Sequence, residues 1–150
     1  LPQVVAASKA MGLAIEMLKP HLGSGEKVGF GTIVMSSVKG DIHEIGKNVC
    51  CAMLRGAGYN VIDLGCDKTA DEIIECAKTK MADIIGASAL MTTTLVAQKE
   101  LVEAVRSANL DFKVVVGGAP CSQQWCDEIG ADGYSANGSE IVALVKSVRD

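Results

Sequence analysis

The sequence has few aromatic side chains. One tryptophan, two tyrosines and two phenylalanines occur among its 150 residues, whereas glycine is abundant. An aromatic-rich β-sandwich would need more rings in its core, while small residues suit the close packing of helices on a sheet. A chain of this length forms one ordinary domain with a sizeable buried core. The composition therefore favours an α/β domain over an aromatic-rich sandwich.

Concentrated basic charge and long apolar runs are also absent. The net charge is −4 and the basic residues are scattered, so no basic stripe could neutralise the phosphates of a nucleic acid. No apolar run is long enough to span a bilayer, and no signal peptide is visible. We therefore expect no nucleic-acid partner, no membrane association and a cytoplasmic location.

Cysteine patterns that bind metals are missing as well. The chain has six cysteines but no Cys-x-x-Cys pair and no cysteine–histidine cluster with zinc spacing. We expect buried or half-buried free thiols in a reducing compartment. The cysteines are Cys50, Cys51, Cys66, Cys76, Cys121 and Cys126.

Short apolar strands alternate with amphipathic helices through most of the chain. Each predicted strand is apolar on both faces, as in a parallel sheet that is covered on both sides. Five such βα units predict a flavodoxin-like, doubly wound five-stranded parallel sheet in the order 2-1-3-4-5. The predicted strands are Gly29–Met35, Asn60–Asp63, Asp83–Ala87, Lys113–Val116 and Gly133–Tyr134.

Two of the predicted helices have further local signals. In the helix after the first strand, Ile45, Val49 and Met53 share one face, which we expect to be its apolar face. The next helix is preceded by Thr69 with Glu72 three residues later. This spacing is typical of a capping box.

Residues 1–24 differ from the rest of the chain. They predict an amphipathic helix that ends near Pro20, and Gly23–Gly25 reads as a short linker. We therefore expect 1–24 to be separate from a domain formed by 25–150. The apolar positions of this helix are Val4, Met11, Ile15, Leu18 and Leu22.

The most informative motif, Asp-x-His-x-x-Gly, follows the first predicted strand. It places His43, one of two histidines, in a loop with Asp41 before it and Gly46 after it. Ligands of doubly wound sheets bind at strand ends beside the switch point, which in this order lies between the first and third strands. Asp41 can hold one ring nitrogen of His43 and leave the other for a metal. The flanking Glu44 and Lys47 are expected to be solvated.

Two further motifs follow the third and fourth predicted strands. Ser88-Ala-Leu90 comes after the third strand and Gly117-Gly118 after the fourth. Taken alone, the glycine pair predicts a tight turn, and Thr94 predicts a helix N-cap. Because parallel strands end at one edge of a sheet, all three motifs are expected to converge there.

The order and spacing of these motifs resemble the signature of cobalamin-binding domains. The segment Gly40–Asn48 is most similar to the methyl-transferring branch, which contains cobalamin-dependent methionine synthase and the corrinoid proteins of methyltransferase systems. The resemblance extends from about Val28 to the C-terminus. It implies a methyl carrier, not catalytic alone, whose cobalamin alternates between cob(I)alamin and methylcobalamin. It also implies that residues 1–24 are the last helix of a truncated helical cap.

The resemblance assigns roles to individual residues. His43 would be the lower axial ligand of cobalt, with Asp41 and Thr94 forming a relay behind it; methionine synthase has serine in place of Thr94. The displaced nucleotide tail would need small residues around it, with Ser88 bonded to the freed benzimidazole nitrogen and Leu90 packed nearby. The implied site comprises Asp41 and Thr94 as catalytic residues, His43 as metal ligand, and Asp41, His43, Gly46, Ser88, Leu90, Thr92, Thr94, Gly117, Gly118 and Ala119 as cofactor-binding residues.

Partners and alternative functions follow from the same resemblance. It implies a substrate-specific methyltransferase, an acceptor methyltransferase that uses tetrahydrofolate or a thiol cofactor, and a reductive activase. The cobalamin domain of an adenosylcobalamin-dependent mutase and a cobalamin-responsive sensor module remain alternatives, as does a signalling receiver. A receiver would need an acceptor aspartate after the third strand, where Ser88–Thr94 has no acid.

Overall fold

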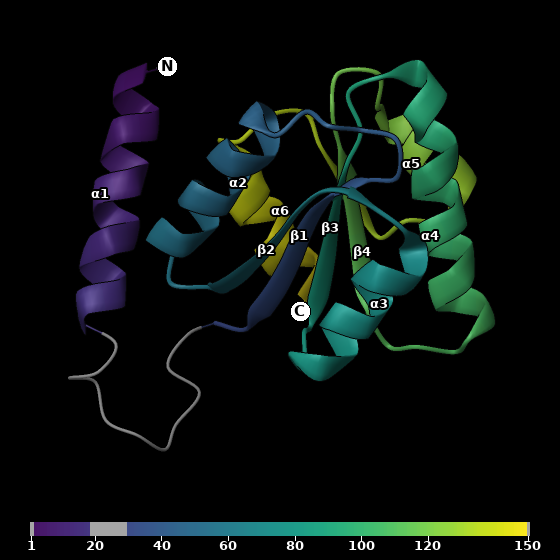
Figure 1. Ribbon diagram of the computed structural model, residues 1–150, viewed down its shortest axis with the longest axis horizontal. Coiled ribbons are helices and arrows are strands. Elements are labelled where there is room, and N and C mark those ends of the chain that lie inside the picture. The colour runs from purple at the N-terminus through teal and green to yellow at the C-terminus, as the bar shows by residue number, and fades with distance from the viewer. Residues whose placement is uncertain (1, 19–29, 150) are drawn as a thin grey trace.

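The computed structural model describes residues 2–18 and 30–149. Within them, five strands form one parallel sheet in the order β2-β1-β3-β4-β5, with helices on both faces (Figure 1). The flavodoxin-like fold predicted from the sequence is therefore confirmed. The strands are β1 (Thr32–Val38), β2 (Asn60–Lys68), β3 (Ile84–Ser88), β4 (Lys113–Gly117) and β5 (Gly133–Ser135).

Each face of the sheet is covered by its own set of helices. Helices α3, α4 and α5 pack on one face, and α2 and α6 pack on the other. Helix α1 runs beside α2 (Figure 1). The helices are α1 (Pro2–Leu18), α2 (Ile45–Gly56), α3 (Ala70–Thr79), the 3-10 helix η2 (Thr92–Thr94), α4 (Leu95–Ser107), α5 (Gln123–Ile129) and α6 (Ile141–Arg149).

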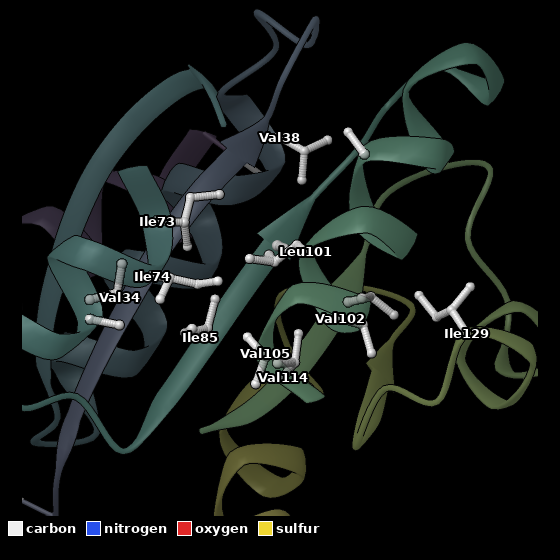
Figure 2. Packing of buried hydrophobic residues seen from close by; sticks show 14 of the residues in the cluster. Val34, Val38, Ile73, Ile74, Ile85, Leu101, Val102, Val105, Val114 and Ile129 are labelled. Carbon is white, nitrogen blue, oxygen red and sulfur yellow. The ribbon is translucent and has the colours of Figure 1, made fainter. Parts of the chain in front are cut away.

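Alternation along the strands builds two apolar cores. Val34 and Ile85 point to the α3–α4 face, where they join Leu101 and its neighbours (Figure 2). Ile33 points to the other face, where it joins Leu54 of α2. Successive strand residues face opposite sides, so strands that are apolar throughout bury both sets. Each fully buried aliphatic side chain contributes about 1.5–3 kcal/mol.

Strand β1 is shifted along the sequence relative to its prediction. It begins at Thr32, after Gly31 with a φ of 137°, and continues through two serines to Val38. Both serines are fully buried, and their hydroxyls donate to backbone carbonyls: Ser36 to Gly65 (3.3 Å) and Ser37 to His43 (2.6 Å). Because these hydroxyls have partners, polar residues extend a strand that hydrophobicity alone ends at Met35.

The predicted apolar face of α2 is not its most buried face, although Val49 and Met53 are half-buried and Met53 packs against the core. The residues of α2 that are buried are Lys47, Cys51 and Leu54, whereas Ile45 is 79% exposed. A buried lysine does not register as apolar, so the periodicity favours a less buried side of the helix. The burial of Lys47 depends on the carboxylate of Asp63 on β2.

Other local predictions have clear outcomes. The capping box of α3 is confirmed, since the Thr69 side chain accepts from the Glu72 backbone and the Glu72 side chain accepts from the Thr69 backbone. All six cysteines are free and buried or half-buried, as predicted. The predicted linker at Gly23–Gly25 and the domain boundary after residue 24 lie outside the described residues. Across the described ranges, no helix combines the length and apolar character that a membrane span requires.

Candidate cofactor-binding site

The three sequence motifs meet at the carboxyl edge of the sheet. The loop containing His43 follows β1, the loop containing Leu90 follows β3, and the Gly118 turn follows β4. Strands β1, β3 and β4 are neighbours with parallel pairing. The predicted convergence of the three motifs is therefore confirmed.

Asp41 links the first two of these loops. Its carboxylate is fully buried. Oδ1 accepts from the backbone N–H of His43 at 3.0 Å and lies 2.8 Å from Nδ1 of the same residue. Oδ2 accepts from the backbone N–H of Leu90 at 2.6 Å and from the hydroxyl of Thr94 at 2.9 Å. One side chain thus fixes the His43 loop against the loop after β3.

These hydrogen bonds keep the Asp41 carboxylate ionised and make it the acceptor in its contact with His43. Burial acts to raise the pKa of Asp41, but the backbone N–H groups of Leu90 and His43, with the side chains of His43 and Thr94, lower it to about 2. The carboxylate is therefore ionised at neutral pH and can only accept. Nδ1 of His43 must then donate to it, so in a neutral imidazole the lone pair lies on Nε2. No hydrogen bond among the described residues uses Nε2, and the His43 side chain is 45% exposed.

Two hydroxyls support the His43 loop. Ser37 is fully buried and donates to the carbonyl of His43. The Thr94 hydroxyl lies within hydrogen-bond distance of Asp41 and of the Met91 carbonyl at 2.8 Å. Thr94 is the N-cap residue of α4, as predicted, but its side chain makes no capping hydrogen bond. Its hydroxyl faces the Asp41 carboxylate instead.

A cavity of about 750 Å³ lies beside His43. It is lined by the loops at this edge and extends along the sheet to Met35, Gly86 and Val115, below α2 and α6. Most of its lining is small or apolar, which is usual for a cofactor pocket. The predicted site residues that line it are His43, Gly46, Ser88, Leu90, Gly117, Gly118 and Ala119.

Three predicted site residues lie elsewhere. Asp41 and Thr94 are buried behind His43 and do not line the cavity. Thr92 is exposed on η2 and is also outside the lining. The predicted site residues therefore fall into two groups: Asp41 and Thr94 support His43 from behind, and the others, except Thr92, line the cavity. The contact of Thr92 with the cofactor stays a prediction.

Sequence reasoning missed Lys47, which is 2% exposed although solvation was expected. Its Nζ forms an ion pair with Asp63 of β2, donates to Oδ1 of Asn48 at 2.9 Å and lies 3.6 Å from Oε1 of Glu44. A buried lysine needs such compensation. The expectation is wrong because the partner of Lys47 lies on a different element, which the local sequence does not reveal.

The loop after β5 was also missed. Ser135, Asn137 and Gly138 line the cavity together with Ile141 of α6. The rule that ligands bind beyond the carboxyl ends of parallel strands applies to β5 as it does to β1, β3 and β4. It was the signal that could have identified these residues.

Two glycines of the site differ in the space around them. Gly118 has a φ of 127°, and a Cβ there would overlap the carbonyl of Ala89. Gly118 therefore lets the loops after β3 and β4 approach each other. A Cβ on Gly46 would meet nothing within 4 Å, so the absence of a side chain there keeps cavity space open.

The single imidazole of His43 fits a cobalt ion whose other ligands come from a macrocycle. A corrin supplies four nitrogens to its cobalt, so the protein would have to supply no more than one side chain, and His43 would be that ligand. Within the described parts of the chain, no three His, Cys, Asp or Glu residues form a metal-binding group of their own. A single imidazole with an available Nε2, beside a cavity wide enough for a cofactor tail, fits a cobalamin.

Comparisons with known proteins agree with this fit. Residues 31–144 match the family described as the B12 binding domain. The chain is 46% identical to a corrinoid protein of Desulfitobacterium hafniense, covering 99% of this chain and 71% of that protein. It is 45% identical to a dimethylamine corrinoid protein of Methanosarcina acetivorans, covering 99% and 70%. It also superposes on a chain of the methanol:cobalamin methyltransferase complex of Methanosarcina barkeri with a TM-score of 0.88 and 31% identity, covering 99% and 57%. The chain therefore belongs to the B12-binding domain family and is a cobalamin-binding corrinoid protein.

Proposed function

We propose that this protein is a methyl carrier that binds cobalamin with His43 as the lower axial ligand. The cofactor's own benzimidazole is displaced, and its nucleotide tail occupies the cavity between the sheet and helices α2 and α6. Bound cobalamin supplies a cobalt that accepts and releases a methyl group. The observation that carries the proposal is the position of the buried Asp41 carboxylate, whose Oδ1 lies 2.8 Å from Nδ1 of His43 and leaves Nε2 available beside the cavity.

The supporting residues tune this ligand. The negative charge of Asp41 makes the imidazole a stronger donor, as carboxylates behind metal-bound histidines commonly do. The hydroxyl of Thr94 and the backbone N–H of Leu90 share that charge. In this proposal, Ser88 hydrogen-bonds the displaced base from its place in the cavity lining, while Gly46, Gly117, Gly118 and Ala119 leave room for the tail.

We further propose a methyltransferase partner that loads the carrier with a methyl group from a small amine or alcohol. One relative is named for dimethylamine and one similar structure for methanol. A second methyltransferase would use tetrahydrofolate or a thiol as the acceptor, and a reductive activase would restore the reduced cofactor. We expect the partner to meet the rim that the loops after β1, β3 and β4 form around the site.

Electron paramagnetic resonance of the protein loaded with Co(II) cobalamin tests the axial ligand. We expect nitrogen hyperfine splitting that stays in its ¹⁴N pattern when the benzimidazole nitrogens of the cofactor are replaced by ¹⁵N. The reciprocal sample, with ¹⁵N-histidine protein and unlabelled cofactor, should change to the ¹⁵N pattern. A change in the first sample instead would identify the cofactor's own base as the ligand and contradict the proposal.

Asp41→Asn is expected to weaken ligation without abolishing cofactor binding. The amide puts an N–H₂ group in place of one carboxylate oxygen, so two donors lose their acceptor, and it removes the negative charge that orients His43. Loss of a partner behind a metal ligand typically costs about 10–100-fold in affinity or activity. Cobalamin titration and the Co(II)/Co(I) potential measure the effect.

Asp111→Asn, on the exposed loop before β4, is the matched control. Potentials and transfer rates equal to those of the wild type would remove Asp41 from the relay.

A further inference from the structure

Gln98 of α4 is fully buried and lies outside the cavity lining. Its Nε2 donates to the carbonyl of Ala87 at 2.9 Å and to that of Gly117 at 3.1 Å. Its Oε1 accepts from Nε1 of Trp125 at 3.0 Å and from Sγ of Cys121 at 3.3 Å. The side-chain amide therefore uses both of its donors and both of its acceptor positions.

The two carbonyls that Gln98 holds belong to the ends of β3 and β4. Ala87 and Gly117 line the cavity. The Gly117 carbonyl also accepts from the backbone N–H of Ala89 at 3.0 Å, in the loop that continues from β3. Gln98 thus contacts, from the opposite face of the sheet, the two strand ends that lead into the cofactor loops.

Simple burial does not explain a glutamine at this position. The neighbours of Gln98 on the buried face of α4 are aliphatic, among them Leu101 and Val102. An apolar side chain would pack there without the cost of desolvating an amide. The direction of the amide is also determined: turned over, its oxygen would face two carbonyls and its N–H₂ would face the indole N–H of Trp125.

We propose that Gln98 is a positioning residue for the cobalamin site. Its amide sets the spacing between the ends of β3 and β4, and therefore the spacing between the Ser88 loop and the Gly118 turn, without touching the cofactor. Trp125 and Cys121 hold the amide from the α5 side. This inference rests on the proposed site, because the two loops matter only if they hold the cofactor.

Gln98→Met tests the donors of the amide. Methionine keeps the length and burial of the side chain but donates no hydrogen bond, so the Ala87 carbonyl loses its side-chain partner. We expect the dissociation constant for hydroxocobalamin to rise by about tenfold or more, since about 1.4 kcal/mol changes an equilibrium tenfold. Trp125→Phe removes one donor to Oε1 and leaves both donors of Gln98. It should raise the dissociation constant by only about two- to threefold.

Val105→Ala is the matched control. Val105 is on the same helix, is fully buried in the same core and contacts neither loop through a hydrogen bond. Urea unfolding of the cofactor-free proteins measures the stability that each variant loses. Amide hydrogen exchange at Ala89, also without cofactor, measures the loop itself. We expect faster exchange at Ala89 in Gln98→Met and unchanged exchange, with unchanged cobalamin affinity, in Val105→Ala.

The outcomes separate this inference from the proposed function. Wild-type protein that binds cobalamin through the axial nitrogen of His43 satisfies the proposed function whatever the variants do. If Gln98→Met then binds as tightly as Val105→Ala, or if its Ala89 amide exchanges at the wild-type rate, the positioning role is overturned. Weaker binding and faster exchange in Gln98→Met, with neither in Val105→Ala, would establish it.

Discussion

Replacing His43 with alanine is expected to abolish the axial nitrogen splitting of bound Co(II) cobalamin. Among the described residues, His43 is the imidazole that lies beside the cavity, and alanine offers no donor. Methyl transfer by the reconstituted system should fall at least as far as it does on losing a supporting residue, by about 100-fold or more. Cofactor affinity should fall much less, because the cavity that receives the nucleotide tail is unchanged.

The chain provides a matched control for this variant. His21 is its other histidine, and His21→Ala should retain the full nitrogen splitting. Added free imidazole should restore the splitting in His43→Ala, because the cavity side of the missing ring is open to a small donor. Splitting that persists in His43→Ala without added imidazole would show that another group ligates the cobalt.

The sheet and the approximate site could be predicted because local patterns determine them. Strands such as β3 and β4 are apolar on both faces, which indicates a covered parallel sheet. Once the strand order was predicted, the edge rule for parallel sheets brought Asp41, Ser88 and Gly117 together without any knowledge of side-chain contacts. The hydrogen bond between Asp41 and His43 could be predicted because the two residues are only two positions apart in the sequence.

The polar residues whose burial was not predicted have partners outside their own helix or strand. Lys47 is buried because Asp63 is on β2, and Gln98 is buried because two strand ends and Trp125 surround its amide. Ser37 extends β1 because its hydroxyl reaches the His43 carbonyl. Polarity scales assign each of these residues to the surface, so periodicity alone fails where a buried polar group is satisfied. Each of the three also supports an element of the candidate site.

Gly118→Ala is expected to damage both the fold and the site. A φ of 127° strains any side chain, and the new Cβ overlaps the Ala89 carbonyl. Strain and overpacking of this kind together cost about 3 kcal/mol or more. Relief of the overlap must move the loop after β3 away from the turn after β4. A displacement of about 1 Å at a functional site can cost about 100-fold, and we expect a loss of cobalamin affinity of that order.

Substitutions at two other glycines distinguish the effect of backbone strain from the effect of lost cavity space. Gly130 has a φ of 73° at the end of α5, and a Cβ there meets nothing within 4 Å. Gly130→Ala should cost about 1 kcal/mol of stability and leave cobalamin binding unchanged. Gly46→Ala places a methyl group in the cavity from the first turn of α2, where alanine is the better helix former by up to about 1 kcal/mol. It should therefore weaken cobalamin binding in a protein at least as stable as the wild type.

Urea unfolding of the cofactor-free proteins and spectral titration with hydroxocobalamin measure both quantities for each variant. The expected pattern is loss of stability and binding in Gly118→Ala, of stability alone in Gly130→Ala, and of binding alone in Gly46→Ala. Because the three substitutions add the same methyl group, the differences arise from what surrounds it. Wild-type affinity in Gly118→Ala would show that the cofactor does not depend on the spacing of these loops. Wild-type affinity in Gly46→Ala would place the nucleotide tail away from the first turn of α2.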